Sequence, residues 1–142
     1  MTSSTTHYYR TGGTCATGWR TTIDLSTHAS GVVTGSGEAS LSSGQRCPFP
    51  TTQPQIKRYD FKVTGSERSG GLSLTLRGSR PADTTGVEYG GFELTLVAHP
   101  RTVVVPIRGK AGSQRFVVRY SGVAGEDRSE SRNTIRLTRV NG

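Results

Sequence analysis

Large apolar residues recur at every second position through most of this chain, and this alternation limits the folds that it can adopt. YDFKV (59–63) and LSLTL (72–76) show the pattern of a strand with one buried and one solvated face. No window of a dozen residues places apolar side chains at the i, i+3, i+4 and i+7 positions of an amphipathic helix. The chain is therefore predicted to be all-β and antiparallel.

The alternation falls into eight groups, and each group is assigned to one strand. Most connections between them are short and rich in Gly and Ser, which favours consecutive hairpins. A long loop at 42–54 holds three prolines, and a charged loop at 122–133 precedes the last predicted strand. The eight groups lie at 19–25, 33–41, 59–63, 72–76, 92–96, 103–107, 116–120 and 135–137.

Eight antiparallel strands must protect or remove their edges. Closure into an up-and-down barrel removes them, whereas a two-sheet sandwich leaves four. Short successive turns favour the barrel, but Pro106 argues against full closure because proline donates no ladder hydrogen bond. We predict an eight-stranded antiparallel up-and-down barrel over residues 14–142, with a two-sheet β-sandwich as the alternative. Residues 1–13 are predicted to form a polar tail.

Gly18-Trp19, at the start of the first predicted strand, resembles the G-x-W signature of lipocalins and the wider calycin barrels, although here the two residues are adjacent. In that superfamily a basic residue from the last strand often stacks on the tryptophan. The resemblance therefore implies that Arg136 or Arg139 stacks on Trp19 through a cation–π contact, worth roughly 0.5–2 kcal/mol. The long helix that lipocalins carry before the last strand has no counterpart here.

The chain has two cysteines, Cys15 before the first predicted strand and Cys47 in the long loop after the second. In a meander these two places lie at the same end of the sheet, so a disulfide is predicted. It closes a loop of about 32 residues and stabilises the fold by roughly 3–4 kcal/mol in the chain-entropy picture. A disulfide predicts a secreted or periplasmic protein, and the alternative is a cytoplasmic protein with free thiols.

Fifteen arginines and three lysines give the chain a net charge of +8. Such an excess attracts polyanions, but the basic residues are dispersed along the sequence, which favours a role in solubility. The aromatic residues fall on the predicted dry faces, so the sequence disfavours nucleic acid as a partner. No membrane span is predicted, because no stretch reaches about 18 apolar residues.

The predicted interior is almost entirely apolar, with Thr21 as the main polar exception. An active site needs several convergent polar groups, whereas a pocket for an apolar ligand needs few. No nucleophile motif and no metal-ligand spacing occur, so no catalytic residue, cofactor or metal is predicted. The predicted ligand-binding residues are Trp19, Thr21, Gly35, Gly37, Tyr59, Phe61, Phe92 and Tyr120.

The sequence thus favours a non-catalytic barrel that binds a small apolar ligand or a protein partner. A protein partner is predicted to contact Tyr8, Tyr9, Arg46 and Phe49, because exposed aromatic residues and arginines anchor interfaces. Two alternatives stay open: a cofactor-free barrel enzyme of the cyclase or isomerase type that shapes an apolar substrate, and a structural subunit of an assembly. Oligomeric state is left open.

Overall fold

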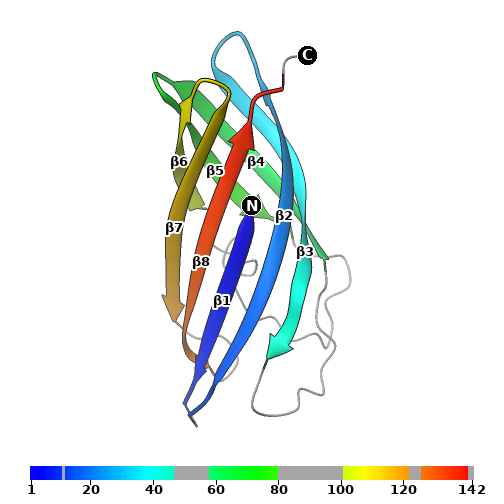
Figure 1. The fold of residues 1–142 in the computed structure, drawn as a ribbon, viewed down its shortest axis with the longest axis vertical. Coiled ribbons are helices and arrows are strands. Elements are labelled where there is room, and N and C mark those ends of the chain that lie inside the picture. Colours follow the sequence, from blue (N-terminus) through cyan, green and yellow to red (C-terminus); the bar gives the residue numbers. More distant parts are fainter. Residues whose placement is uncertain (11, 47–57, 80–100, 122–125, 141–142) are drawn as a thin grey trace.

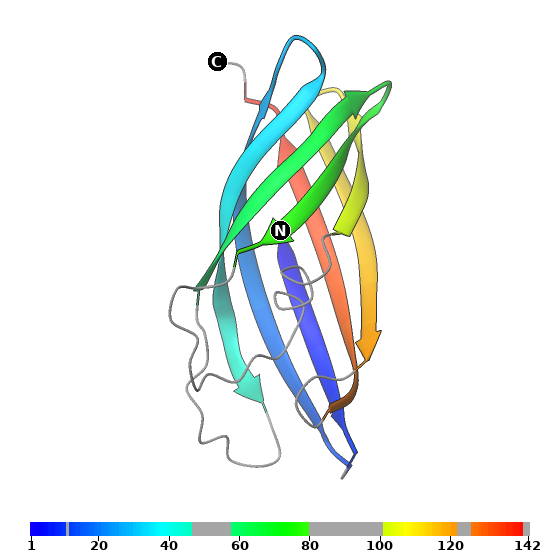
Figure 2. The same cartoon turned by 180° about the vertical axis from the view of Figure 1, so that it is seen from behind.

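The computed structural model describes residues 1–10, 12–46, 58–79, 101–121 and 126–140. The predicted all-β barrel is confirmed: eight antiparallel strands form one closed sheet in the order β1 to β8, and the two-sheet sandwich is not observed (Figures 1 and 2). No helix in the described ranges is long and apolar enough to cross a membrane. The strands are β1 (Thr2–Tyr9), β2 (Thr14–Thr27), β3 (Val32–Arg46), β4 (Arg58–Arg68), β5 (Gly71–Gly78), β6 (Arg101–Arg108), β7 (Ala111–Ser121) and β8 (Glu126–Thr138).

The prediction of a polar tail at residues 1–13 is wrong, because Thr2–Tyr9 form β1 and join the two ends of the sheet. Thr2 pairs with Arg20 of β2 on one side and with Thr134 of β8 on the other. Figure 1 shows β1 between β8 and β2, with the chain start at about mid-height of the barrel. The segment alternates as strands do, but its inward residues, Ser3, Thr5 and His7, are polar, so apolar periodicity does not reveal it.

The predicted loop at 122–133 is also wrong over most of its length, because β8 begins at Glu126. Arg128, Glu130 and Arg132 point outward, while the small residues between them are buried. Charged residues that alternate with small uncharged ones follow the period of a strand. The predicted strand at 92–96 lies outside the described residues, and β5 pairs directly with β6, for example Leu74 with Val103.

Three hairpin turns, which join β2 to β3, β4 to β5 and β6 to β7, lie at one end of the barrel (Figure 1). Each contains a glycine with positive φ, namely Gly31 (78°), Gly70 (86°) and Gly109 (60°). Glycine adopts this left-handed backbone without the steric cost that a Cβ imposes. Each of these turns sets the register of the two strands that it joins.

The apolar core fills the part of the barrel nearest these turns. Phe61, Leu74 and Ile135 are among its largest fully buried side chains. β3 lies so close to β2 there that a Cβ on Gly37 would clash with the backbone of Thr22. The core cluster comprises Trp19, Val33, Ala39, Phe61, Val63, Leu72, Leu74, Leu76, Val103, Val105, Val118 and Ile135.

Pro106 marks the weakest described seam of the barrel. β6 and β7 pair only at Ile107 with Gly112 and at Arg108 with Ala111. The N–H of Ile107 donates to Gly70 O of the β4–β5 turn. Ladder hydrogen bonds alternate in direction, so residue 106 faces β7, where proline has no N–H to donate. The ladder between β6 and β7 therefore ends beside Pro106. The barrel still closes, although these two strands pair at only two described positions.

Candidate functional site

Nine buried residues form a three-by-three arrangement on the inner face of β8, β1 and β2, which we call the inner polar grid. It occupies the part of the barrel farther from the three glycine turns. Cross-strand pairing puts each β1 residue between one residue of β8 and one of β2. None of the nine is more than 6% exposed. The rows are Asn133–Ser3–Trp19, Ser131–Thr5–Thr17 and Ser129–His7–Cys15.

Side-chain hydrogen bonds join β1 to β8 across this grid. Thr5 Oγ1 donates to Ser131 Oγ over 3.1 Å, and Ser131 Oγ donates in turn to Asn133 Oδ1 over 3.2 Å. Asn133 Nδ2 donates to the carbonyl of Ser131 over 3.1 Å. His7 Nδ1 lies 3.0 Å from Ser129 Oγ in the row below. Buried polar groups are stable when they are paired in this way, so the network holds the first strand against the last.

Two hydroxyl groups of the grid differ from the others. Ser3 Oγ and Thr17 Oγ1 are buried, and neither has a hydrogen-bond partner within the described part of the chain. Ser3 faces Trp19 across the strand pair, and Thr17 precedes Trp19 by two residues on the same face. A buried hydroxyl without a partner costs about 1–3 kcal/mol. The two hydroxyls beside the indole therefore favour a polar group at this place.

The prediction of an almost entirely apolar interior is wrong for this half of the barrel. The inward residues of β1 and of the first half of β8 are Ser, Thr, His and Asn. They were missed because burial of a small polar residue depends on its neighbours across the strands, which hydropathy along one chain does not record. The available signal was the regular spacing of uncharged polar residues and a histidine at 3, 5 and 7 and at 129, 131 and 133.

The structure gathers only part of the predicted ligand set. Trp19, Thr21 and Phe61 are buried on the inner face. Gly35 and Gly37 leave no space, because a Cβ on either would clash with β2. The side chains of Tyr59 and Tyr120 are outside the described part of the structure, as is the whole of Phe92.

The predicted partner-binding residues do not form one described surface. Tyr8 lies on the outer face of β1, where the Arg128 guanidinium sits 4.5 Å from the centre of its ring. Tyr9 is half-buried at the end of the strand. Arg46 pairs with Ala16 through its backbone, and Phe49 lies outside the described residues.

The stacking implied by the calycin resemblance is not formed by Arg136 or Arg139. Trp19 is on the inner face, whereas Arg136 is exposed on the outer face of β8. Arg139 follows the end of β8, and its Nη2 donates to Glu67 Oε1 over 2.6 Å. Through Ser3, the last-strand residue level with Trp19 is Asn133. A polar residue therefore stands at the level where a basic one was expected.

Cys15 is fully buried at the edge of the inner polar grid. No cysteine in the described ranges is a free thiol. Its predicted partner, Cys47, lies outside those ranges, so the disulfide stays a prediction. The pairing of Ala16 with Arg46 supports it, because these are the sequence neighbours of the two cysteines.

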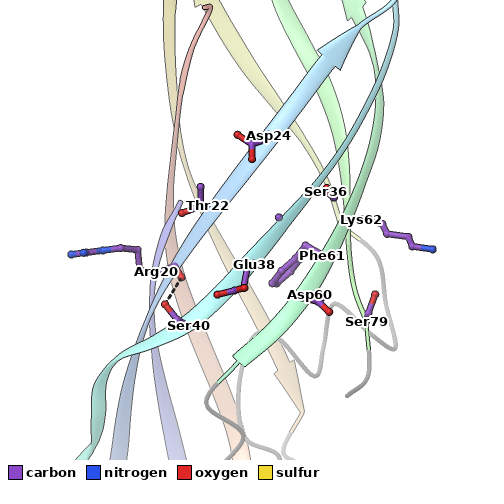
Figure 3. Close-up of a pocket in the computed structure, with 11 residues that line it drawn as sticks. Arg20, Thr22, Asp24, Ser36, Glu38, Ser40, Asp60, Phe61, Lys62 and Ser79 are labelled. Atoms are coloured by element: carbon purple, nitrogen blue, oxygen red, sulfur yellow. Dashed lines mark hydrogen bonds between the residues drawn. The ribbon is translucent and has the colours of Figure 1, made fainter. Parts of the chain in front are cut away.

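A hollow of about 640 Å³ lies on the outer wall over β2, β3 and β4 (Figure 3). Glu38 and Asp60 face each other across β3 and β4, and Arg58 forms an ion pair with Glu38. No described group of three or more His, Cys, Asp or Glu side chains is arranged to hold a metal. The lining residues are Arg20, Thr22, Asp24, Ser36, Gly37, Glu38, Ser40, Asp60, Phe61, Lys62 and Ser79.

The outer hollow mixes both signs of charge on an open strand surface, whereas the inner polar grid combines burial, a hydrogen-bond network and an indole ring. Ligand sites are mostly enclosed surfaces with a few well-placed polar groups. The inner polar grid is therefore the stronger candidate site. Comparison with known protein families, with curated proteins and with solved structures finds no match.

Proposed function

We propose that this protein is a non-catalytic binding barrel whose ligand is a small molecule with an apolar body and a hydrogen-bonding group. The observation that carries the proposal is the pair of buried hydroxyls, Ser3 Oγ and Thr17 Oγ1, beside the Trp19 indole. The polar group of the ligand contacts these hydroxyls. The sequence alone favoured a small apolar ligand or a protein partner, and the polar residues of the grid are the reason for the change.

The surroundings of the grid support such an amphipathic ligand. Trp19 belongs both to the grid and to the apolar core cluster, so it stands where the polar and apolar parts of the interior meet. Indole rings bury a large apolar surface. An apolar body on Trp19 and a polar end near Ser3 would match both surfaces.

Family and compartment belong to the same proposal. The closed up-and-down order of eight strands and the inward Trp19 support kinship with the calycin barrels. The absence of a free thiol among the described cysteines supports a bridge to Cys47 and thus a secreted or periplasmic location.

One observation favours the catalytic alternative. His7 Nδ1 and Ser129 Oγ, 3.0 Å apart and both buried, are within the distance at which an imidazole accepts a proton from a hydroxyl. A barrel enzyme that shapes an apolar substrate would use this pair for proton transfer. If the protein is such an enzyme, we expect the His7→Ala variant to retain its bound substrate with unchanged mass, whereas the wild-type protein converts the substrate to product.

The test is native mass spectrometry of protein purified from its natural host, followed by the mass of the denatured chain. We expect an extra mass that denaturation removes, and we expect Ser3→Ala and Thr17→Val to reduce its occupancy. Ser4→Ala and Thr14→Val are the matched controls, because they make the same changes at exposed neighbouring positions. A bare wild-type chain, or equal occupancy in all four variants, would overturn the proposal.

A further inference from the structure

Five arginines that are scattered along the sequence meet on the outer face of β7 and β8, which we call the arginine face. All five side chains are exposed. β7 and β8 pair along eleven successive positions, from Ala111 with Thr138 to Ser121 with Arg128, so their outward residues form one surface. The five are Arg115, Arg119, Arg128, Arg132 and Arg136.

Glu130 is the one acidic side chain described on this face. Arg119 Nε donates to its Oε2 over 2.8 Å, and Arg132 Nε donates to its Oε1 over 3.0 Å. Both ion pairs use Nε, and the two arginine side chains stay 74% and 79% exposed. The guanidinium forks are therefore oriented while their outer N–H groups face solvent. Among the described side chains of this face, five arginines and one glutamate leave four net positive charges.

Hydroxyl groups lie beside the arginines on the same outer surface. Thr2, Ser4 and Thr6 of β1 pair with Thr134, Arg132 and Glu130 of β8. Arginine forks and neighbouring hydroxyls are the groups that contact phosphate oxygens in protein–DNA complexes. The surface thus offers both kinds of donor over adjacent strands.

We propose that the arginine face binds the phosphate backbone of double-stranded DNA. Arg128 and Arg136 are eight residues apart on β8, which corresponds to roughly 27 Å of strand and to about eight base pairs at 3.4 Å each. The arginines lie on the outer wall of the barrel, where β8 also pairs with β1, so that arginine forks and hydroxyls of adjacent strands can contact successive phosphates of a duplex. Dispersal along the sequence favoured a role in solubility, but the pairing of β7 with β8 brings these five arginines onto one surface.

Other polyanions fit the described surface less well. Single-stranded nucleic acid needs aromatic platforms, whereas Arg128 covers the ring of Tyr8. Membrane surfaces bind amphipathic elements with several large apolar residues, whereas Val117 is the one exposed large apolar side chain described on β7 and β8. A sulfated glycan shares the anionic charge, and heparin therefore becomes an arm of the test.

The experiment is a fluorescence-anisotropy titration of the full chain with a short labelled DNA duplex over a series of salt concentrations. We expect log Kd to depend linearly on log salt, with a slope of about 0.9 for each phosphate neutralised. The test variant is Arg115→Gln/Arg128→Gln/Arg136→Gln, which spares both partners of Glu130. The matched control is Arg77→Gln/Arg101→Gln/Arg108→Gln, which removes the same charge from exposed positions on β5 and β6.

In the test variant we expect the salt slope to fall by about 2.7, which is three times 0.9, while the control variant retains the wild-type slope. Circular dichroism confirms the fold of both. Equal weakening in the two triple variants would show attraction by net charge alone and overturn the proposal. Binding of heparin, but not of duplex, through the arginine face would also overturn it and identify a glycan surface.

Discussion

The hydroxyl of Thr5 donates a hydrogen bond to the hydroxyl of Ser131, 3.1 Å away, inside the barrel where the first strand meets the last. Both side chains are fully buried. Closure of this sheet therefore uses buried polar contacts between its first and last strands.

We expect Thr5→Val to destabilise the fold by about 1–3 kcal/mol, because it leaves Ser131 Oγ buried with one contact fewer. The double variant Thr5→Val/Ser131→Ala should lose less than the sum of the two single variants, since the second substitution removes the group left without its partner. Urea unfolding measures all three. Ser4→Ala, on the exposed face of the same strand, is the control and should stay within about 0.5 kcal/mol of wild type. Strictly additive losses would show that the two hydroxyls do not interact.

The proposed disulfide between Cys15 and Cys47 predicts that the intact chain, purified without reductant, is two hydrogens lighter than the reduced chain. Removing both cysteines in Cys15→Ala/Cys47→Ala should cost about 3–4 kcal/mol of unfolding free energy, as expected for a closed loop of about 32 residues. Reductant should lower the urea midpoint of the wild-type chain and leave that of the double variant unchanged. Two free thiols in the native protein would refute both the bridge and the proposed compartment.

The strands that could be predicted from the sequence are those whose inward residues are apolar. Leu72, Leu74 and Leu76 alternate with polar residues and are buried in β5, because the same hydropathy that marks them also drives their burial. The closed barrel was predicted from the short successive turns, but the strand that closes it, Thr2–Tyr9, was not. Gly31 and Gly70 were recognisable as turn residues because few other residues adopt positive φ.

The candidate site could not be predicted in this way. Ser3, Thr5 and His7 look like a solvated tail, and they are buried only because β8 and β2 lie on either side of them. The arginine face was hidden for a related reason: Arg115 and Arg132 become neighbours through the register of β7 with β8, which is not encoded in the alternation of either strand alone.

The seam beside Pro106 predicts an alternation in amide hydrogen exchange along β6. Val103 and Val105 pair with β5 and direct their N–H groups toward it, as Ile107 does toward Gly70. Val104 directs its N–H toward β7, where the described ladder has ended, and its side chain is 60% exposed. We expect the Val104 amide to exchange on the order of tenfold faster than its two neighbours. Equal protection of all three amides, measured by NMR, would show that β7 pairs with β6 beyond Pro106.

Glu130 gives the last prediction, which concerns pH. Its hydrogen bonds from Arg132 and Arg119 hold the pKa of this carboxyl below its ordinary value. A carboxyl whose pKa is lower in the folded state than in the unfolded chain binds fewer protons when folded, so it stabilises the fold above the unfolded pKa. That contribution is lost as the pH falls through the lowered folded pKa. We therefore expect Glu130→Gln to be less stable than wild type at neutral pH and equal to it in strong acid.

The check is the difference in urea midpoint between the two proteins across this pH range. Arg119→Gln/Arg132→Gln, which removes both donors, should abolish the pH dependence of that difference, and a difference that stays constant into strong acid would rule out the carboxylate as its source.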